Sequence, residues 1–198
     1  MLMQTVHTQP LVGKQSFSII RHGQTLWNAE DRLQGRTDIE LNAEGIRQAE
    51  ALARQLDGTP ITMLVTSPLK RAYETSVIIG KRHKLSITKE PALTERSFGS
   101  FEKRYRHEIL AEQNLPREQK TQIVYPEDAE TENDVRQRAL ACIQHWLDKY
   151  PKEHIAFIGH SALFRILHKS LNLGEGFNAD YAKRYILTPT LNGWNISE

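Results

Sequence analysis

Short apolar runs alternate along the chain with longer stretches in which apolar residues recur at helical spacing. The three runs are FSII at 17–20, ITMLVT at 61–66 and HIAFIG at 154–159. They are rich in β-branched and aromatic residues and apolar throughout, which is typical of strands covered on both faces in a parallel sheet. The pattern therefore predicts three buried strands.

Helical periodicity marks four further stretches: 41–56, 67–83, 131–150 and 161–171. In the first, Asn42 is the expected N-cap, because its side-chain oxygen can accept a backbone N–H of the first turn. In the second, Ser67 is the expected cap and Pro68 the first helical residue. Strands that alternate with helices predict an α/β fold, a three-layer α/β/α sandwich with a mainly parallel central sheet.

The chain of 198 residues has the length of one domain with its own core. We expect residues 1–16 to form a loose N-terminal arm, since they lack the long apolar run of a signal peptide. Residues 17–198 are expected to form a single domain. Within it the polar stretch from about 102 to 129, with Pro116 and Pro126, is predicted to be a small cap or insertion over one end of the sheet.

Charge and composition narrow the class of protein. A formal net charge of +2 is nearly balanced, so charge does not predict a nucleic-acid partner. The sequence has no apolar run of the roughly 20 residues that span a bilayer. We therefore expect neither nucleic acid nor a membrane among its partners, and a cytoplasmic location is the simplest expectation.

Cys142 is the single cysteine of the chain, which excludes an internal disulfide and a cysteine-based zinc site. It shares the apolar face of the predicted helix at 131–150 with neighbours at helical spacing. We interpret it as a buried core thiol rather than a catalytic one.

Polar residues follow each predicted strand where the strand ends. The first strand is followed by Arg21, His22 and Gly23, the second by a helix start that contains Arg71, and the third by His160 and Ser161. In open α/β sheets, ligands bind beyond the carboxyl ends of the strands. We therefore expect these side chains to gather at one edge of the sheet, near helix N-termini that favour anions.

Two arginines and two histidines in one pocket repel one another unless an anion binds between them. A phosphoryl group suits such a pocket, because guanidinium groups bind its oxygens in bidentate fashion. A histidine with an ordinary pKa near 6.5 offers a neutral ring nitrogen that can attack phosphorus and form a phosphohistidine. The residues alone predict that His22 is a nucleophile beside a phosphate clamp.

Five motifs, in the same order along the chain, resemble those of the histidine phosphatase superfamily, the phosphoglycerate-mutase-like group, in its phosphatase branch. They are RHGQTLWN at 21–28, RLQG at 32–35, SPLKRAYET at 67–75, LTERSFGSFE at 93–102 and IGHS at 158–161. The resemblance covers nearly the whole chain from Phe17. It implies a phosphoric monoester hydrolase of the histidine acid phosphatase type that uses no metal and no other cofactor.

The resemblance also implies roles for individual residues. His22 would carry the phosphoryl group, Arg21, Arg71 and His160 would hold its oxygens, and Asn28, Gln34, Gly35 and Ser161 match positions that line the phosphate or substrate site. Glu95 matches the residue that protonates the leaving oxygen and then activates water. Glu102 is the rival carboxylate for that role.

Two positions depart from the family pattern. Phe101-Glu102-Lys103 stands where many phosphatase members have Trp-Glu-Gly, and Ser161 stands where glycine usually follows the second histidine. The first difference bears on the shape of the cap and on substrate fit. Neither removes a catalytic group.

The predicted function is metal-independent hydrolysis of a small phosphorylated metabolite through a phosphohistidine. A phosphoglycerate-mutase-type phosphotransferase is one alternative, since only the acceptor of the phosphoryl group differs. A phospho-ligand binding protein without catalysis is another. Sugar phosphates, phosphoglycerates, a nucleotide-loop intermediate of cobalamin synthesis and phosphoproteins all stay open as substrates, and the resemblance leaves a homodimer open.

The predicted cap is basic, with Lys103, Arg104, Arg106, His107, Arg117 and Lys120. Such a run fits either recruitment of a polyanionic substrate or an ordinary solvated helix face. We favour the solvated face.

Overall fold

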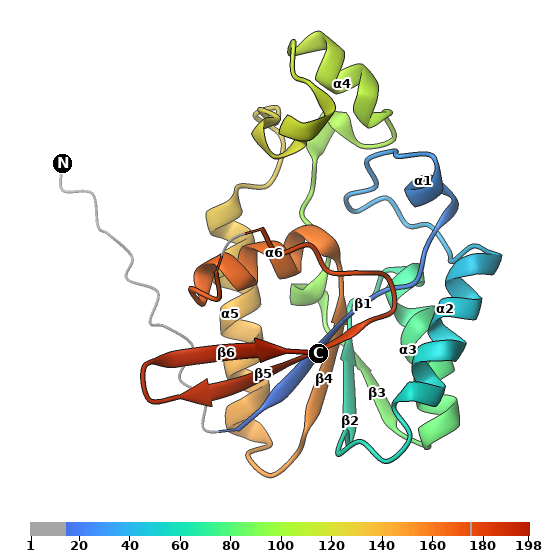
Figure 1. Cartoon of the computed structure of the whole chain (residues 1–198), viewed down its shortest axis with the longest axis vertical. Helices are drawn as coiled ribbons and strands as arrows, with labels where there is room; N and C mark the ends of the chain where they lie inside the picture. The colour runs from blue at the N-terminus through green and yellow to red at the C-terminus, as the bar shows by residue number, and fades with distance from the viewer. Residues whose placement is uncertain (1–14, 175) are drawn as a thin grey trace.

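A six-stranded sheet forms the centre of the protein in the computed structural model, which describes residues 15–174 and 176–198 (Figure 1). The strands are β1 (Phe17–Arg21), β2 (Met63–Thr66), β3 (Ser86–Lys89), β4 (Ile155–Gly159), β5 (Arg184–Thr190) and β6 (Gly193–Ser197). Their order across the sheet is β3-β2-β4-β1-β5-β6. The first four in this order are parallel, whereas β5 and β6 are antiparallel to their neighbours, so the sheet is mainly parallel as predicted.

Within the described residues, six α-helices and three short 3-10 helices accompany the sheet. They are α1 (Leu26–Ala29), α2 (Ala43–Gln55), α3 (Lys70–His83), α4 (Arg106–Glu112), α5 (Glu132–Lys149), α6 (Ser161–Ser170), η1 (Pro91–Leu93), η2 (Gly99–Phe101) and η3 (Arg117–Gln122). Figure 1 shows α2 and α3 on one face of the sheet and α5 and α6 on the other. Each face is sealed by its own apolar cluster, which confirms the predicted three-layer sandwich.

The predicted cap of the first long helix is confirmed, and that of the second is wrong. Asn42 accepts the backbone N–H of Gly45 at 2.8 Å and caps α2. Ser67, by contrast, still belongs to the end of the sheet, because its N–H donates to the carbonyl of Ile158 at 2.9 Å. Helix α3 therefore begins only at Lys70, whose N–H is bound by the carboxylate of Asp38 at 2.7 Å.

The segment predicted as a cap lies beyond the carboxyl ends of the parallel strands and contains α4 and η3 (Figure 1). It has its own apolar cluster with partners outside the segment: Leu33, Phe98, Ile109, Leu110, Ile123 and Ala162. Leu33 exchanges backbone hydrogen bonds with Lys103 and Arg104, at 2.8 and 2.9 Å. These contacts join the segment to the loop after α1 and to α6.

Two other predictions concern the N-terminal arm and Cys142. Residues 1–14 of the predicted N-terminal arm lie outside the described residues, but the side chain of Gln15 donates to the carbonyl of Tyr150 at 3.1 Å. Cys142 is buried in α5 within the larger apolar cluster, as predicted. Over the described residues, every helix is too short or too polar to cross a bilayer.

Candidate active site

A pocket of about 290 Å3 opens beyond the carboxyl ends of β1 and β4, under the cap segment. The structure brings all of the predicted site residues together here. The pocket is lined by Arg21, His22, Asn28, Gln34, Gly35, Arg71, Glu95 and Ser161. His160 is fully buried, and its ring centroid lies 5.2 Å from that of His22.

Close backbone packing explains the glycine of the Arg-His-Gly sequence. A Cβ atom on Gly23 would overlap the carbonyl of Gly45 at the start of α2. The N–H of Gly23 donates to Thr75 Oγ1 at 3.1 Å, and the N–H of His22 continues the parallel ladder to the carbonyl of Gly159 at 3.0 Å. The backbone that carries His22 is thus fixed from α2, α3 and β4.

His22 is held in one tautomer. Its Nδ1 lies 2.6 Å from the carbonyl oxygen of Gly23, and since a carbonyl only accepts, Nδ1 carries the ring proton. Burial, followed by the charges of Arg71 and Arg21, holds the pKa of His22 well below its ordinary value. The imidazole is therefore neutral at neutral pH, with its lone pair on Nε2.

Arg71 is almost fully buried and is oriented by main-chain carbonyls. Its two terminal nitrogens donate to the carbonyls of Gly35 at 2.7 Å and Thr37 at 2.9 Å. Burial lowers the pKa of Arg71 to about 10, so the guanidinium stays charged at neutral pH. Its Nε is buried without a hydrogen-bond partner among the described residues.

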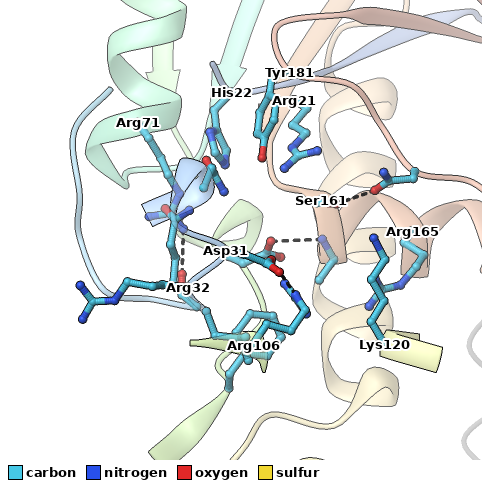
Figure 2. Close-up of a pocket in the computed structure, with 18 of the residues that line it drawn as sticks. Arg21, His22, Asp31, Arg32, Arg71, Arg106, Lys120, Ser161, Arg165 and Tyr181 are labelled. Atoms are coloured by element: carbon cyan, nitrogen blue, oxygen red, sulfur yellow. Dashed lines mark hydrogen bonds and ion pairs between the residues drawn. The ribbon is translucent and has the colours of Figure 1, made fainter. Parts of the chain in front are cut away.

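Arg21 is oriented by a distant loop. One terminal nitrogen donates to the carbonyl of Ala179 at 2.6 Å, and the guanidinium carbon lies 3.8 Å from the centroid of the Tyr181 ring. Its Nε, like that of Arg71, has no partner within the described part of the chain. Figure 2 shows His22 between these two arginines, and the charges of both lower its pKa.

His160 is paired with the serine that was expected to cap α3. Its Nε2 lies 2.8 Å from Ser67 Oγ, which itself accepts the N–H of Leu69 at 3.3 Å. Because Ser67 Oγ already accepts the N–H of Leu69, we assign its hydroxyl proton to His160 Nε2. The ring proton is then on Nδ1, a buried atom without a partner among the residues that the structure describes. Burial and the charge of Arg71 lower the pKa of His160, so this ring is also neutral.

The two rival carboxylates have different positions. Glu95 lines the pocket at the N-terminus of α6 and accepts the N–H groups of Ala162 and Leu163 at 3.1 and 3.0 Å. Glu102 accepts the N–H groups of Arg36 and Thr37 at 3.0 and 3.1 Å and lies outside the set of residues that line the pocket. Glu102 thus fixes the loop after Gly35, whereas Glu95 faces the site.

The remaining predicted residues shape the rim. Asn28 accepts the N–H of Thr25 at 3.1 Å through its side-chain oxygen, so its amide nitrogen is left for the pocket. Gly35 has a φ of +52°, and a Cβ there would overlap Glu102. Ser161, in the position where glycine is usual, donates to Asn178 Oδ1 at 3.3 Å.

Sequence reasoning missed several residues of the pocket. Tyr181 and Ala179 orient Arg21 from a loop with no helical or strand pattern, so no local signal marks them. The sequence predicted Ser67 as a helix cap, whereas its hydroxyl contacts the ring of His160. Arg165 also lines the pocket, and its position four residues after Ser161 on one helix face was an available signal.

Within residues 15–174 and 176–198, no group of three His, Cys, Asp or Glu side chains is arranged to hold a metal ion. The charged groups of the pocket are instead arginines and one lysine, with carboxylates as counter-charges.

Comparison with known proteins shows the family of this chain. Residues 17–198 match the histidine phosphatase superfamily (branch 1). The uncharacterized phosphatase PhoE of Bacillus subtilis (strain 168) is 30% identical over 161 residues, which cover 79% of this chain and 77% of the relative. Phosphoglycerate mutase-like protein 4 of Arabidopsis thaliana is 33% identical over 159 residues, covering 76% and 68%.

Solved structures share the fold over almost the whole chain. A mycobacterial glucosyl-3-phosphoglycerate phosphatase in complex with VO3 has a TM-score of 0.79 at 25% identity and covers 92% of this chain and 97% of its own. YhfR of Bacillus stearothermophilus has a TM-score of 0.80 at 23% identity, with 92% and 95% covered, and shows the fold alone. Because the match runs from Phe17 through the last strand, this chain belongs to the histidine phosphatase superfamily, branch 1.

Proposed function

We propose that the protein hydrolyses phosphomonoesters of small metabolites through a phosphohistidine at His22. The observation that carries the proposal is the hydrogen bond from His22 Nδ1 to the carbonyl of Gly23. It leaves the lone pair on Nε2, between two guanidinium groups that match a phosphoryl group in charge and geometry. A neutral, oriented ring nitrogen in a cationic pocket is what nucleophilic attack on phosphorus needs.

In the first half-reaction, Nε2 of His22 attacks phosphorus while the bond from phosphorus to the leaving oxygen breaks. Arg21 and Arg71, with Nδ1–H of His160, donate to the phosphoryl oxygens and balance their charge. Protonated Glu95 gives its proton to the leaving oxygen, so the alcohol departs neutral. The products of this step are the alcohol, ionised Glu95 and a P–N bond at His22.

In the second half-reaction, water replaces the alcohol beside Glu95. The carboxylate takes a proton from the water as its oxygen attacks phosphorus, and the P–N bond breaks with its electron pair returning to Nε2. Inorganic phosphate leaves, and both groups regain their starting protonation. The same residue therefore serves as acid and then as base.

The names of the relatives and neighbours favour hydrolysis, although one of the relatives is named mutase-like. The relative from Bacillus subtilis is named a phosphatase, and the mycobacterial neighbour at 25% identity is named a glucosyl-3-phosphoglycerate phosphatase. The relative from Arabidopsis is named mutase-like. A mutase shares the first half-reaction and passes the phosphoryl group to a second hydroxyl, so incubation with a phosphoglycerate distinguishes the two by whether free phosphate or the positional isomer accumulates.

The test is p-nitrophenyl phosphate hydrolysis with EDTA present, between about pH 5 and 8, a range that brackets the ordinary histidine pKa. The intact chain is compared with His22→Ala and with His107→Ala, an exposed histidine of α4 outside the pocket. We expect turnover in the intact chain and in the His107 variant and its loss in the His22 variant. Acid-labile, base-stable radiolabel on the intact chain after a rapid quench would identify the P–N bond.

Turnover that persists in His22→Ala would overturn the proposed nucleophile. Binding of phosphate esters without any turnover in the intact chain would favour the non-catalytic alternative.

A further inference from the structure

Four cationic side chains line the pocket beyond the residues proposed to bind the reacting phosphoryl group: Arg32, Arg106, Lys120 and Arg165 (Figure 2). Two of them are already paired. Arg106 binds the carboxylate of Asp31 at 3.0 Å, and Arg32 binds Glu30 at 3.4 Å. Their charges are balanced within the protein.

Lys120 and Arg165 differ from these two. Neither side chain makes a hydrogen bond, ion pair or ring contact with any residue that the structure describes. The three carboxylates that line the pocket are engaged elsewhere: Asp31 pairs with Arg106, Asp180 pairs with Lys183 at 3.4 Å, and Glu95 accepts two N–H groups at the start of α6. Two cations without counter-charges therefore face the same cavity.

The pair comes from two separate parts of the fold. Arg165 lies in α6, one turn after Ser161, and is half-buried, while Lys120 is exposed on η3 of the cap. Both also line an adjoining hollow that contains the carboxylates of Glu127 and Glu132, neither of which forms an ion pair with Lys120 or Arg165; Glu132 pairs with Arg96 and Lys169. Figure 2 shows them at the opposite end of the pocket from His22 and Arg21.

We propose that Lys120 and Arg165 bind a second anionic group, a carboxylate or a phosphate, carried by the leaving alcohol of the substrate. This inference rests on the proposed function at His22, because the phosphoryl group held there fixes which end of the substrate reaches the pair. A lysine ammonium and an arginine fork together suit an oxyanion. A cavity of about 290 Å3 restricts the leaving group to a small metabolite.

The positions of the basic cap residues fit this assignment. Of the six basic cap residues, only Arg106 and Lys120 line the pocket, and Arg106 is paired with Asp31. Lys120 is thus the one basic residue of that set with its charge free for a substrate in the pocket.

A binding experiment tests the subsite apart from catalysis. Two phosphonates that cannot be hydrolysed, 3-carboxybenzylphosphonate and its neutral 3-carbamoyl analogue, have nearly the same shape and differ in one charge. Calorimetry on the intact chain should give a dissociation constant about tenfold lower for the carboxylate, the size expected of charged hydrogen bonds. Added salt should reduce this ratio.

The double substitution Lys120→Gln with Arg165→Gln should bring the ratio close to one. Arg117→Gln, on the same 3-10 helix but outside this pocket, is the matched control and should keep the preference. Equal affinities in the intact chain, or a ratio unaffected by the double substitution, would overturn the proposal. Propane-1,3-diol bisphosphate against the monophosphate, in a phosphate-release assay, tells whether the second anion is a phosphate.

The two proposals fail separately. Preferential binding of the carboxylate phosphonate without turnover of any ester would reject hydrolysis and keep the anion subsite. Turnover of the carboxyphenyl and carbamoylphenyl phosphates at equal kcat/KM would keep hydrolysis and reject the subsite.

Discussion

Ser67 Oγ and His160 Nε2 lie 2.8 Å apart, and this contact joins the end of β2 to the end of β4. Both residues are fully buried. The contact orients the ring of His160, so Ser67 is a positioning residue for a group proposed to hold the phosphoryl oxygens, and we assign the hydroxyl proton of Ser67 to His160 Nε2 because the serine oxygen already accepts the N–H of Leu69.

Ser67→Ala should lower kcat/KM for p-nitrophenyl phosphate by about tenfold, because His160 loses the partner that keeps its proton on Nδ1. Ser76→Ala is the control: Ser76 is equally buried, in α3, and its hydroxyl donates to the carbonyl of Tyr73 at 2.6 Å. The Ser76 variant should lose a comparable free energy of unfolding but keep its kcat/KM for p-nitrophenyl phosphate. Equal effects of the two substitutions on kcat/KM would contradict the positioning role.

Glu95→Gln should affect poor leaving groups most. Without an acid, an alkyl phosphate must expel an alkoxide, so kcat/KM for that ester should fall by about 100-fold or more. The value for p-nitrophenyl phosphate should fall far less, since nitrophenolate leaves without protonation. Steady-state kinetics on both esters measure the contrast, and equal losses would remove Glu95 from the role of acid.

Glu102→Gln is predicted to act on stability instead. Its carboxylate binds the N–H groups of Arg36 and Thr37 and the hydroxyl of Thr37. Loss of these charged hydrogen bonds should destabilise the fold by about 1–3 kcal/mol in urea unfolding. Any loss of turnover should be the same for alkyl and nitrophenyl esters, and a strong leaving-group dependence would make Glu102 the acid.

Gly45→Ala should destabilise the protein, although alanine is normally the better residue in a helix by about 1 kcal/mol. The reason is that a Cβ at Gly45 would overlap the backbone of Gln24, beside His22. Gly80→Ala in α3 is the matched control, because its Cβ would meet the flexible end of Ile87 at 2.9 Å and would approach the backbone no closer than 3.3 Å, at the carbonyl of Leu85. If Gly80→Ala lowers the melting temperature as much as Gly45→Ala does, then the overlap with Gln24 is not the cause of the lost stability.

The free energy of unfolding should fall as the pH drops below about 6.5. The pKa of His22 is lowered in the fold by burial and by Arg71, so in this range the unfolded chain binds a proton that the folded protein does not. Each such histidine contributes a slope of up to about 1.4 kcal/mol per pH unit. His22→Gln should reduce the slope in urea titrations at a series of pH values, and an unchanged slope would contradict the lowered pKa.

The strands that the sequence predicted are those with continuous apolar runs. β1 and β4 are buried at every position, and β2 at three of its four. The three missed strands are partly exposed, and β5 and β6 alternate in burial for part of their length. Leu191 and Asn192 form the short loop between β5 and β6, and Asn192 followed by Gly193 is a turn signal that the sequence analysis did not use.

The site was predictable where it follows from strand ends, because parallel strands bring their carboxyl ends to one edge. Contacts between segments far apart in the chain were not. Ser67 and His160 are 93 positions apart, and Arg21 and Ala179 are 158 apart. Contacts between residues so far apart in the chain produce no periodic pattern and no characteristic spacing in the sequence.

The distance between Arg21 and Ala179 along the chain also sets an order during synthesis. A ribosome that has produced β1 must add 158 more residues before the carbonyl that orients Arg21 exists, and β5, the partner of β1 on that side, follows later still. At about 5–20 residues per second this takes several seconds or more. Both edges of β1 are open until β4 is made, and the edge that pairs with β5 stays open longest and is prone to wrong pairing. The nascent chain holds His22, the proposed nucleophile, early but acquires the contact that orients Arg21 only late in the translation of this domain.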